Sequence, residues 1–148
     1  MIKIEKDEKF KFIDGYNNKY LISNYGKVFN LRTFKFLKIN KNSSGYPRVE
    51  LYKGNKNGIR LRKMEFLHLL VVKYFGDCMG RTFSNKEFDN INILEVDHID
   101  KNPMHCYQSN LQIVSNKENI RRKYIDNFER NKLIEKAKFN YINLQEIF

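Results

Sequence analysis

Three structural signals follow one another between residues 93 and 123, and they constrain the fold more than any other feature. Residues 93–98 and residues 110–114 are short apolar segments of the kind that pair as β-strands. Ser115 follows the second segment, and Glu118 stands three residues later, which is the spacing of a helix-capping box. We therefore predict a strand, a polar loop, a partner strand and a helix in that order.

Polar side chains stand at the junctions of this predicted unit. Asp97 and His98 end the first strand, Asn110 begins the second, and Asn119 lies about one turn into the helix. Asp97 offers the hard oxygen that suits Mg²⁺, and the amide oxygen of Asn119 could approach the same ion. His98 can accept a proton from water near neutral pH, and Asn110 could orient it. Because successive strand residues point to opposite faces, Asp97 and His98 need a twist in the strand to meet in one cleft.

Most of the net positive charge of the chain comes from one segment. The 148 residues carry 28 Lys and Arg against 17 Asp and Glu, a net charge of +11. Residues 27–63 hold eleven of the basic residues and a single acidic residue, Glu50. Such a surface attracts polyanions, either nucleic acid or an anionic membrane. The chain has no apolar run long enough for a membrane span and no secretory h-region at its start, so we expect an intracellular protein that makes no membrane contact.

Within the basic segment, residues 45–52 and 59–62 predict a β-hairpin that the Asn57-Gly58 pair closes. Alternation places Val49, Leu51, Ile59 and Leu61 on one face. The opposite face receives Arg48, Tyr52, Arg60 and Arg62. A cationic two-stranded ribbon fits the major groove of double-stranded DNA, although a solvated sheet face gives the same pattern. The predicted DNA-binding residues are Arg48, Arg60, Arg62, Lys63, Arg121 and Arg122.

The remaining periodicity divides the chain into three parts. Residues 1–63 form a β-rich basic module, residues 64–124 contain a central helix and the strand–loop–strand–helix unit, and residues 125–148 form a helical tail. A broad apolar stripe over residues 64–75 predicts the central helix, with His68 on its more polar side as a core or capping residue. Residues 76–92 read as a connector with a short helix around Lys86. The fold class is α+β.

The tail is expected to form a helix of its own, separate from the one that Ser115 begins. Its apolar stripe is expected to pack on the body or on another chain. The stripe consists of Ile134, Ala137, Tyr141, Leu144 and Phe148. The two cysteines, Cys78 and Cys106, are too few for a disulfide scaffold, and His105 with Cys106 cannot close a tetrahedral zinc site.

Three segments of the predicted site resemble a known motif. They are Val96-Asp97-His98-Ile99-Asp100, Asn110-Leu111 and Asn116-Lys117-Glu118-Asn119. In residue type and spacing they resemble the HNH nucleases, whose site is a ββα-metal motif, and they are similar to the intron-encoded HNH homing endonucleases of phages. The first half of the chain is similar to the modular N-terminal region of these nucleases, in residues 12–16, 20–28, 45–46 and 68–71.

The resemblance implies a small β-rich N-terminal module, a central helix, the ββα-metal motif and a C-terminal helix. It also implies a divalent cation, Mg²⁺ or Mn²⁺, held by Asp97 and Asn119. His98 would be the general base and Asn110 the orienting residue, with Asp97 counted among the catalytic residues. The implied activity is hydrolysis of phosphodiester bonds in double-stranded DNA by a metal-dependent endonuclease, in the manner of a homing-type nicking enzyme.

Two other functions are compatible with the sequence. A nuclease-derived DNA-binding protein with an idle site would keep the basic surface, but the intact set of Asp97, His98, Asn110 and Asn119 argues against it. A basic RNA-binding or ribosome-associated protein would account for the charge and leave the Asp97-His98 pair unexplained. The oligomeric state stays open, with a monomer favoured.

Overall fold

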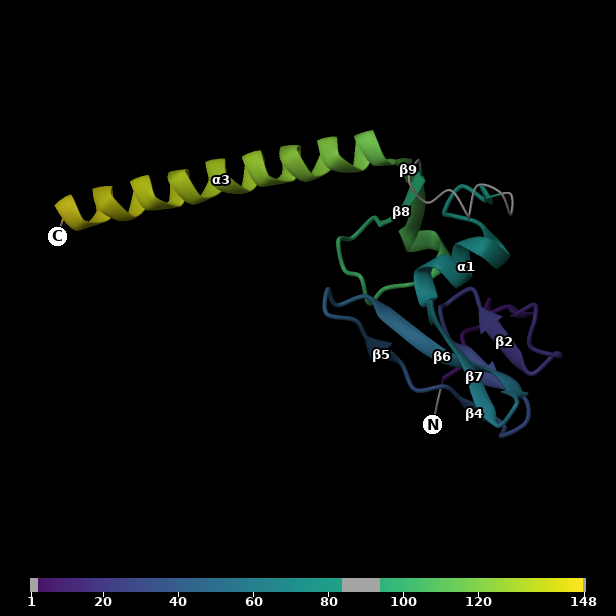
Figure 1. Ribbon diagram of the computed structural model, residues 1–148. Coiled ribbons are helices and arrows are strands. Elements are labelled where there is room, and N and C mark those ends of the chain that lie inside the picture. Colours follow the sequence, from purple (N-terminus) through teal and green to yellow (C-terminus); the bar gives the residue numbers. More distant parts are fainter. Residues whose placement is uncertain (1–2, 84–93, 148) are drawn as a thin grey trace.

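The chain forms an α+β structure, seen in a computed structural model that describes residues 3–83 and 94–147 (Figure 1). Within these residues it has three antiparallel sheets, two α-helices and one 3₁₀ helix. The predicted fold class is therefore confirmed. The short helix expected around Lys86 lies outside the described residues.

The first sheet has the strand order β1-β2-β3-β4. Its strands are β1 (Phe10–Phe12), β2 (Tyr20–Ser23), β3 (Val28–Asn30) and β4 (Lys35–Phe36). The turn between β2 and β3 contains Gly26 at φ +76°, in the left-handed region that glycine adopts without strain. Phe34 adopts φ +53°, outside the extended region, and β4 begins after it at Lys35.

The second sheet has three strands and contains the predicted hairpin, residues 47–66, which we call the basic hairpin. The strands of this sheet are β5 (Asn40–Lys41), β6 (Pro47–Lys56) and β7 (Ile59–Phe66). Asn57 and Gly58 have φ +51° and +77°, the two positive values that a type I′ turn requires. Strand β7 runs further than expected, because its last residues stay paired with β6 as far as Phe66 opposite Arg48. The central helix, α1 (Leu67–Phe75), consequently begins three residues later than predicted.

The third sheet confirms the predicted strand–loop–strand–helix order, and we call residues 94–123 the ββα unit. Its elements are β8 (Leu94–His98), the 3₁₀ helix η1 (Gln108–Asn110), β9 (Leu111–Ser115) and the first turns of α3 (Asn116–Ile147). Ser115 caps the helix, since its Oγ accepts the backbone N–H of Glu118 at 3.1 Å.

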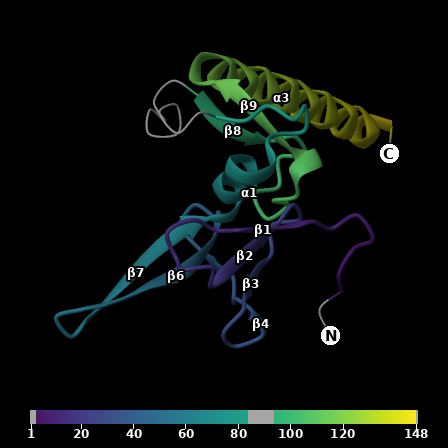
Figure 2. The same ribbon diagram turned by 90° about the vertical axis from the view of Figure 1, so that its right-hand side faces the viewer.

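Helix α3 is continuous over 32 residues and extends away from the rest of the molecule (Figures 1 and 2). The expectation of a separate tail helix is wrong, because α3 crosses the boundary between residues 124 and 125 without a break. Ile134 is 42% exposed rather than packed on the body. The other members of the predicted stripe lie outside the described side chains. Neither helix in the described part of the chain is long and apolar enough to cross a membrane.

One hydrophobic core connects the first two sheets, α1 and the ββα unit (Figure 2). Ile22 of β2, Leu51 of β6, Val71 of α1 and Leu111 of β9 are completely buried in it. The mostly buried helix predicted from the apolar stripe is therefore confirmed. The core fixes the ββα unit against the N-terminal sheets.

A buried carboxylate adds a polar connection between α1 and β9. Asp77, which is 0% exposed, accepts the backbone N–H of Ile113 at 3.0 Å and the guanidinium of Arg81 at 2.7 and 3.0 Å. Burial raises the pKa of Asp77, but these hydrogen bonds outweigh burial and leave it below its ordinary value. Gly76 begins the turn at φ +83°, where a Cβ would lie 2.9 Å from the Arg81 carbonyl oxygen.

Candidate active site

A cavity of about 320 Å³ opens where the ββα unit meets the basic module. Its lining comes from Tyr46, Asp97, His98, Lys101, Pro103, Asn119, Lys123, Asp126 and Asn127. Asp97, His98 and Asn119, three of the four residues singled out from the sequence, therefore share one cavity. Although Asp97 and His98 are neighbours on β8, His98 is the last residue of the strand, so both reach the rim of the same cavity.

Asp97 is held by side chains from the partner strand and the helix. It lies opposite Gln112 in the β8–β9 register, and Gln112 Nε2 donates to Asp97 Oδ2 at 3.0 Å. Arg122 Nη1 on α3 lies 3.7 Å from the same oxygen. The carboxylate is thus fixed in direction while one of its oxygens remains for a ligand.

Asn119 is oriented by a carboxylate that sequence reasoning missed. Its Nδ2 donates to Glu95 Oε2, and the residue is 7% exposed. Because an amide has one nitrogen and one oxygen, the contact with Glu95 leaves Asn119 Oδ1 as the atom that can face a cation. Glu95 stands two residues before Asp97, and alternation on a strand places both on one face. That spacing was the available signal.

Asn110 acts on the loop that follows His98 and not on the His98 ring. Its Nδ2 donates to Asp100 Oδ1 at 3.0 Å and to the His105 carbonyl at 2.9 Å, while its Oδ1 accepts the Asp100 N–H. Its backbone carbonyl accepts the N–H of Ile99 at 2.8 Å. These bonds go to the residues after His98, so any orienting effect of Asn110 on the imidazole acts through the backbone. Asn110 fixes the backbone immediately after His98.

The same loop carries a strong carboxylate–imidazole contact. His105 Nδ1 lies within hydrogen-bond distance of Asp100 Oδ2, and the backbone N–H of Asn102 donates to Asp100 Oδ1 at 2.9 Å. The His105 contact and these hydrogen bonds lower the pKa of Asp100 to about 2. Lys101, in the turn between them, adopts φ +64° and forms an ion pair with Asp126 of α3.

His98 is 5% exposed and sits among other rings. Its ring centroid is 5.3 Å from that of His68 on α1 and 6.0 Å from that of Tyr46. Burial lowers the pKa of His98, and the charges of Asp97 and Asp100 oppose the shift only in part. Burial therefore favours the neutral imidazole.

His68 and Cys106 complete the surroundings of His98, and neither was singled out as a site residue. His68 is 9% exposed, so its expected place on the polar side of the helix is wrong, although its expected role as a core residue is confirmed. Burial, and then the neighbouring His98, lower the pKa of His68 to about 3. The Cys106 Sγ lies 3.7 Å from His98 Nε2, and burial raises the pKa of this thiol to about 12.

Basic side chains from α3 border the cavity. Arg121 and Arg122 both bind the carboxylate of Glu118, with Nε–O distances of 2.9 and 3.0 Å. These contacts lower the pKa of Glu118 to about 2. Arg122 also lies next to Asp97, as described above, and Lys123 lines the cavity. Two arginines of α3, Arg121 and Arg122, were predicted to bind DNA, and Arg122 is the one that lies next to Asp97.

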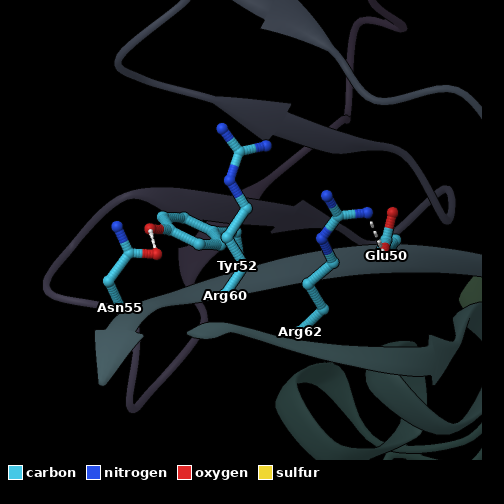
Figure 3. A pocket seen from close by; sticks show the side chains of 5 residues that line it. All are labelled: Glu50, Tyr52, Asn55, Arg60 and Arg62. Atoms are coloured by element: carbon cyan, nitrogen blue, oxygen red, sulfur yellow. Dashed lines mark hydrogen bonds and ion pairs between the residues drawn. The ribbon is translucent and has the colours of Figure 1, made fainter. Parts of the chain in front are cut away.

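The basic hairpin carries a second concave surface of about 420 Å³, shown in Figure 3. Its lining residues are Glu50, Tyr52, Asn55, Arg60 and Arg62. The register pairs Tyr52 with Arg62 and Asn55 with Arg60, so the predicted cationic face is confirmed. Arg62 Nη1 contacts Glu50 Oε1 at 3.0 Å, and the Tyr52 hydroxyl donates to Asn55 Oδ1 at 2.8 Å.

Two features of the hairpin go beyond what the sequence predicted. Lys63 pairs with Leu51 in the register, on the face opposite Arg60 and Arg62, and it forms an ion pair with Glu65 at 2.8 Å. The predicted apolar face is buried only at its base. Val49 and Leu51 are 0% exposed, whereas Ile59 is 67% exposed because the distal hairpin extends past the core (Figure 2). Arg48, near the base, is half-buried.

A β-hairpin followed by a helix, with Asp97 and His98 ending the first strand and Asn119 on the helix, is the ββα arrangement that the sequence resemblance implied. Comparison with known proteins agrees. Residues 8–52 match the NUMOD4 motif. The H-N-H endonuclease F-TflII of Escherichia phage T5 is 35% identical over 113 residues, which are 76% of this chain and 51% of that protein. The DNA endonuclease I-HmuI of Bacillus phage SP01 is 33% identical over 112 residues, 76% of this chain and 55% of that protein.

A solved structure gives the same result. It describes DNA binding and cleavage by the HNH homing endonuclease I-HmuI, and it superposes with a TM-score of 0.63 at 28% sequence identity. The match covers 88% of this chain and 67% of that one. Over 76% of its length the chain is therefore similar to the phage HNH endonucleases, as the sequence resemblance implied. It spans about half the length of the curated relatives that it matches.

Proposed function

We propose that this protein is a metal-dependent DNA endonuclease of the HNH type that hydrolyses phosphodiester bonds in double-stranded DNA. The observation that carries the proposal is the cavity shared by Asp97, His98 and Asn119. The relationship to phage HNH endonucleases supports it independently.

The residues of the cavity fit a hard divalent cation. The Asp97 carboxylate and the Asn119 amide oxygen are oxygen donors, which Mg²⁺ and Mn²⁺ prefer, and both side chains are held in place by Gln112 and Glu95. When bound, the cation supplies charge neutralisation at the scissile phosphate. The neighbouring cations Lys123 and Arg122 would add to that neutralisation.

His98 would act as the general base. The imidazole accepts a proton from the attacking water, and burial supports this role because it lowers the pKa of His98 and so favours the neutral form. Asn110 would position His98 through the following loop, since it binds both Ile99 and Asp100. One cavity of this kind acts on one phosphodiester bond at a time, so a single chain would nick one strand.

The basic hairpin would supply DNA affinity. Among the described residues Arg60 has no ion-pair partner, and it stands with Arg62 and Tyr52 on an exposed concave face (Figure 3). A two-stranded ribbon of this form fits the major groove. Arg48 at the base of the hairpin and Arg121 and Arg122 on α3 would extend the contact to the backbone near the cut.

A plasmid-nicking assay tests the proposal. In Mg²⁺ the wild type should convert supercoiled plasmid to the nicked form, EDTA should stop the reaction, and His98→Ala should lose on the order of 10² in rate or more. Cys78→Ser is the control, because this cysteine is exposed and is not among the lining residues of the cavity. DNA binding without cleavage by the wild type would leave a binding protein with an idle site. Near wild-type cleavage by His98→Ala would end its assignment as the base.

A further inference from the structure

His68, His98 and Cys106 form a compact buried group, which we call the His–Cys cluster. One potential ligand atom from each residue lies within 4.8 Å of the other two. The three residues come from separate elements, namely α1, the end of β8 and the loop before η1. The fold therefore brings two imidazoles and one thiol together from distant parts of the sequence.

An unsatisfied atom in the cluster points independently to a missing ligand. His68 is only 9% exposed, and its Nδ1 is buried with no hydrogen-bond partner in the described part of the chain. Leaving a polar atom buried and unpaired costs about 1–3 kcal/mol, so such atoms are rare in folded proteins. A cation at the cluster would give this imidazole the partner that the protein alone does not provide.

The spacing suits a tetrahedral soft-metal site. Zn²⁺ binds sulfur at about 2.3 Å and imidazole nitrogen at about 2.0 Å, which places neighbouring ligand atoms about 3.5 Å apart. His98 Nε2 and Cys106 Sγ are already 3.7 Å apart. All three ligand atoms lie within 4.8 Å of one another. Rotation of the side chains would bring the wider pairs to the distance that the metal requires.

We propose that the His–Cys cluster binds Zn²⁺ or a similarly thiophilic divalent ion through His68, His98 and Cys106, with water as the fourth ligand. On binding, the Cys106 thiol releases its proton to solvent and the sulfur bonds to the metal as thiolate. This site is distinct from the oxygen-donor site of Asp97 and Asn119. Mg²⁺ does not compete for it, because hard cations avoid thiolate and imidazole sets.

Occupation of the cluster would remove His98 from proton transfer, since its Nε2 becomes a metal ligand. A soft metal would therefore inhibit the nuclease in the presence of excess Mg²⁺. This consequence rests on the proposed function, whereas metal binding at the cluster does not. Cobalt spectroscopy separates the two, because it needs neither DNA nor cleavage.

The test uses Co²⁺ as an optical substitute for Zn²⁺ in the full-length protein. The wild type should show a thiolate-to-cobalt charge-transfer band in the near ultraviolet together with visible d–d bands of tetrahedral cobalt, and Zn²⁺ should displace both. Cys106→Ser should lose the charge-transfer band, while Cys78→Ser, a change at an exposed cysteine, should keep it. His68→Gln should keep the band but need at least about tenfold more Co²⁺.

Each outcome decides the proposal. A wild-type protein without the charge-transfer band overturns it, whatever the variants do, and so does a band that persists in Cys106→Ser. A band with the expected variant pattern supports the site even if Mg²⁺ produces no cleavage, which would remove only the proposed nuclease function. If cleavage occurs, micromolar Zn²⁺ should inhibit the wild type more strongly than His68→Gln, and equal inhibition overturns the inhibitory role.

Discussion

The basic hairpin and the ββα unit both carry charged side chains, but they hold them in different ways. In the ββα unit Asp97, Asn119 and Asn110 each have a fixed partner, and His98 is 5% exposed. On the hairpin Arg60 and Arg62 stand on exposed strands beyond the core, and the one ion pair of Arg62 is itself exposed. Proton transfer and metal binding need atoms placed to within a fraction of an ångström, whereas attraction to a polyanion needs only net charge of the right sign.

Substitutions in the two regions should also differ in their effect on stability. Substitutions in the ββα unit remove hydrogen bonds from buried groups, which cannot find water as a replacement. Substitutions on the distal hairpin change side chains that are already in contact with water, so they should alter stability little. The two regions should therefore differ in whether a substitution changes activity, stability or DNA affinity.

The largest expected effect is on the rate of cleavage. Asp97→Ala should lower nicking by about 10³-fold or more, because it removes the charged donor to the proposed cation. Gln112→Ala, which removes only the hydrogen bond that orients Asp97, should lose about 10- to 100-fold. Single-turnover nicking at fixed Mg²⁺ measures both. If the two variants lost rate equally, Asp97 would not be a direct ligand.

The next effect concerns stability. Asp77→Ala should lower the free energy of unfolding by about 3 kcal/mol, because it leaves the buried N–H of Ile113 without a partner and removes the ion pair with Arg81. Glu50→Ala breaks a carboxylate–arginine pair of similar length on the hairpin, at 3.0 Å, but that pair is exposed and should contribute less than about 0.5 kcal/mol. Urea denaturation of both variants tests the contrast. Equal losses would refute it.

A smaller effect should appear in DNA affinity. Arg60→Ala with Arg62→Ala should weaken binding about tenfold at physiological salt and lower the slope of log K against log salt by about 1.8, if each contacts one phosphate. Lys63→Ala is the control, since this lysine lies on the opposite face. Binding titrations at several salt concentrations measure both. An unchanged slope in the double variant would place DNA elsewhere, with α3 as the next candidate.

A further effect is a pH dependence of stability at the buried site. Burial holds the pKa of His68 at about 3, whereas an unfolded imidazole titrates near about 6.5. Between these values the unfolded chain binds a proton that the folded chain does not, so the free energy of unfolding falls as pH decreases below about 6.5.

His68→Gln should make this dependence shallower by up to about 1.4 kcal/mol per pH unit. The Arg60→Ala, Arg62→Ala variant should follow the wild type, because the hairpin lies apart from the buried histidines. Urea denaturation from pH 7 to pH 4.5 compares the three proteins. Parallel curves for the wild type and His68→Gln would mean that His68 is protonated in the folded state.

Local signals made both regions partly predictable from the sequence. The ββα unit was predictable because local signals coincide there: two apolar segments, the Ser115 cap, and polar residues at fixed positions between them. The hairpin register was predictable because Asn57 and Gly58 determine the turn and alternation then determines the faces. Both kinds of signal act over a few residues.

Contacts between distant segments could not be predicted in this way. His68 lies thirty residues before His98 in sequence, and its own helix pattern gave no sign that the two rings would meet. The end of β7 at Phe66 depends on pairing with Arg48, and the burial of Val49 but not Ile59 depends on where α1 crosses the sheet. Each of these features is set by tertiary packing rather than by local propensity.

The length of α3 has a consequence for how the protein opens. Its first turns, including Asn119, pack against β8 and β9, but Tyr124, Phe128 and Leu133 are 73%, 67% and 67% exposed. A helix without packing is only marginally stable in water. Backbone amides near Asn119 should therefore exchange with solvent hydrogen only when the whole domain unfolds, whereas amides beyond Tyr124 should exchange through local opening. The boundary between slow and fast exchange would lie within one helix, inside the stretch of α3 that lines the cavity.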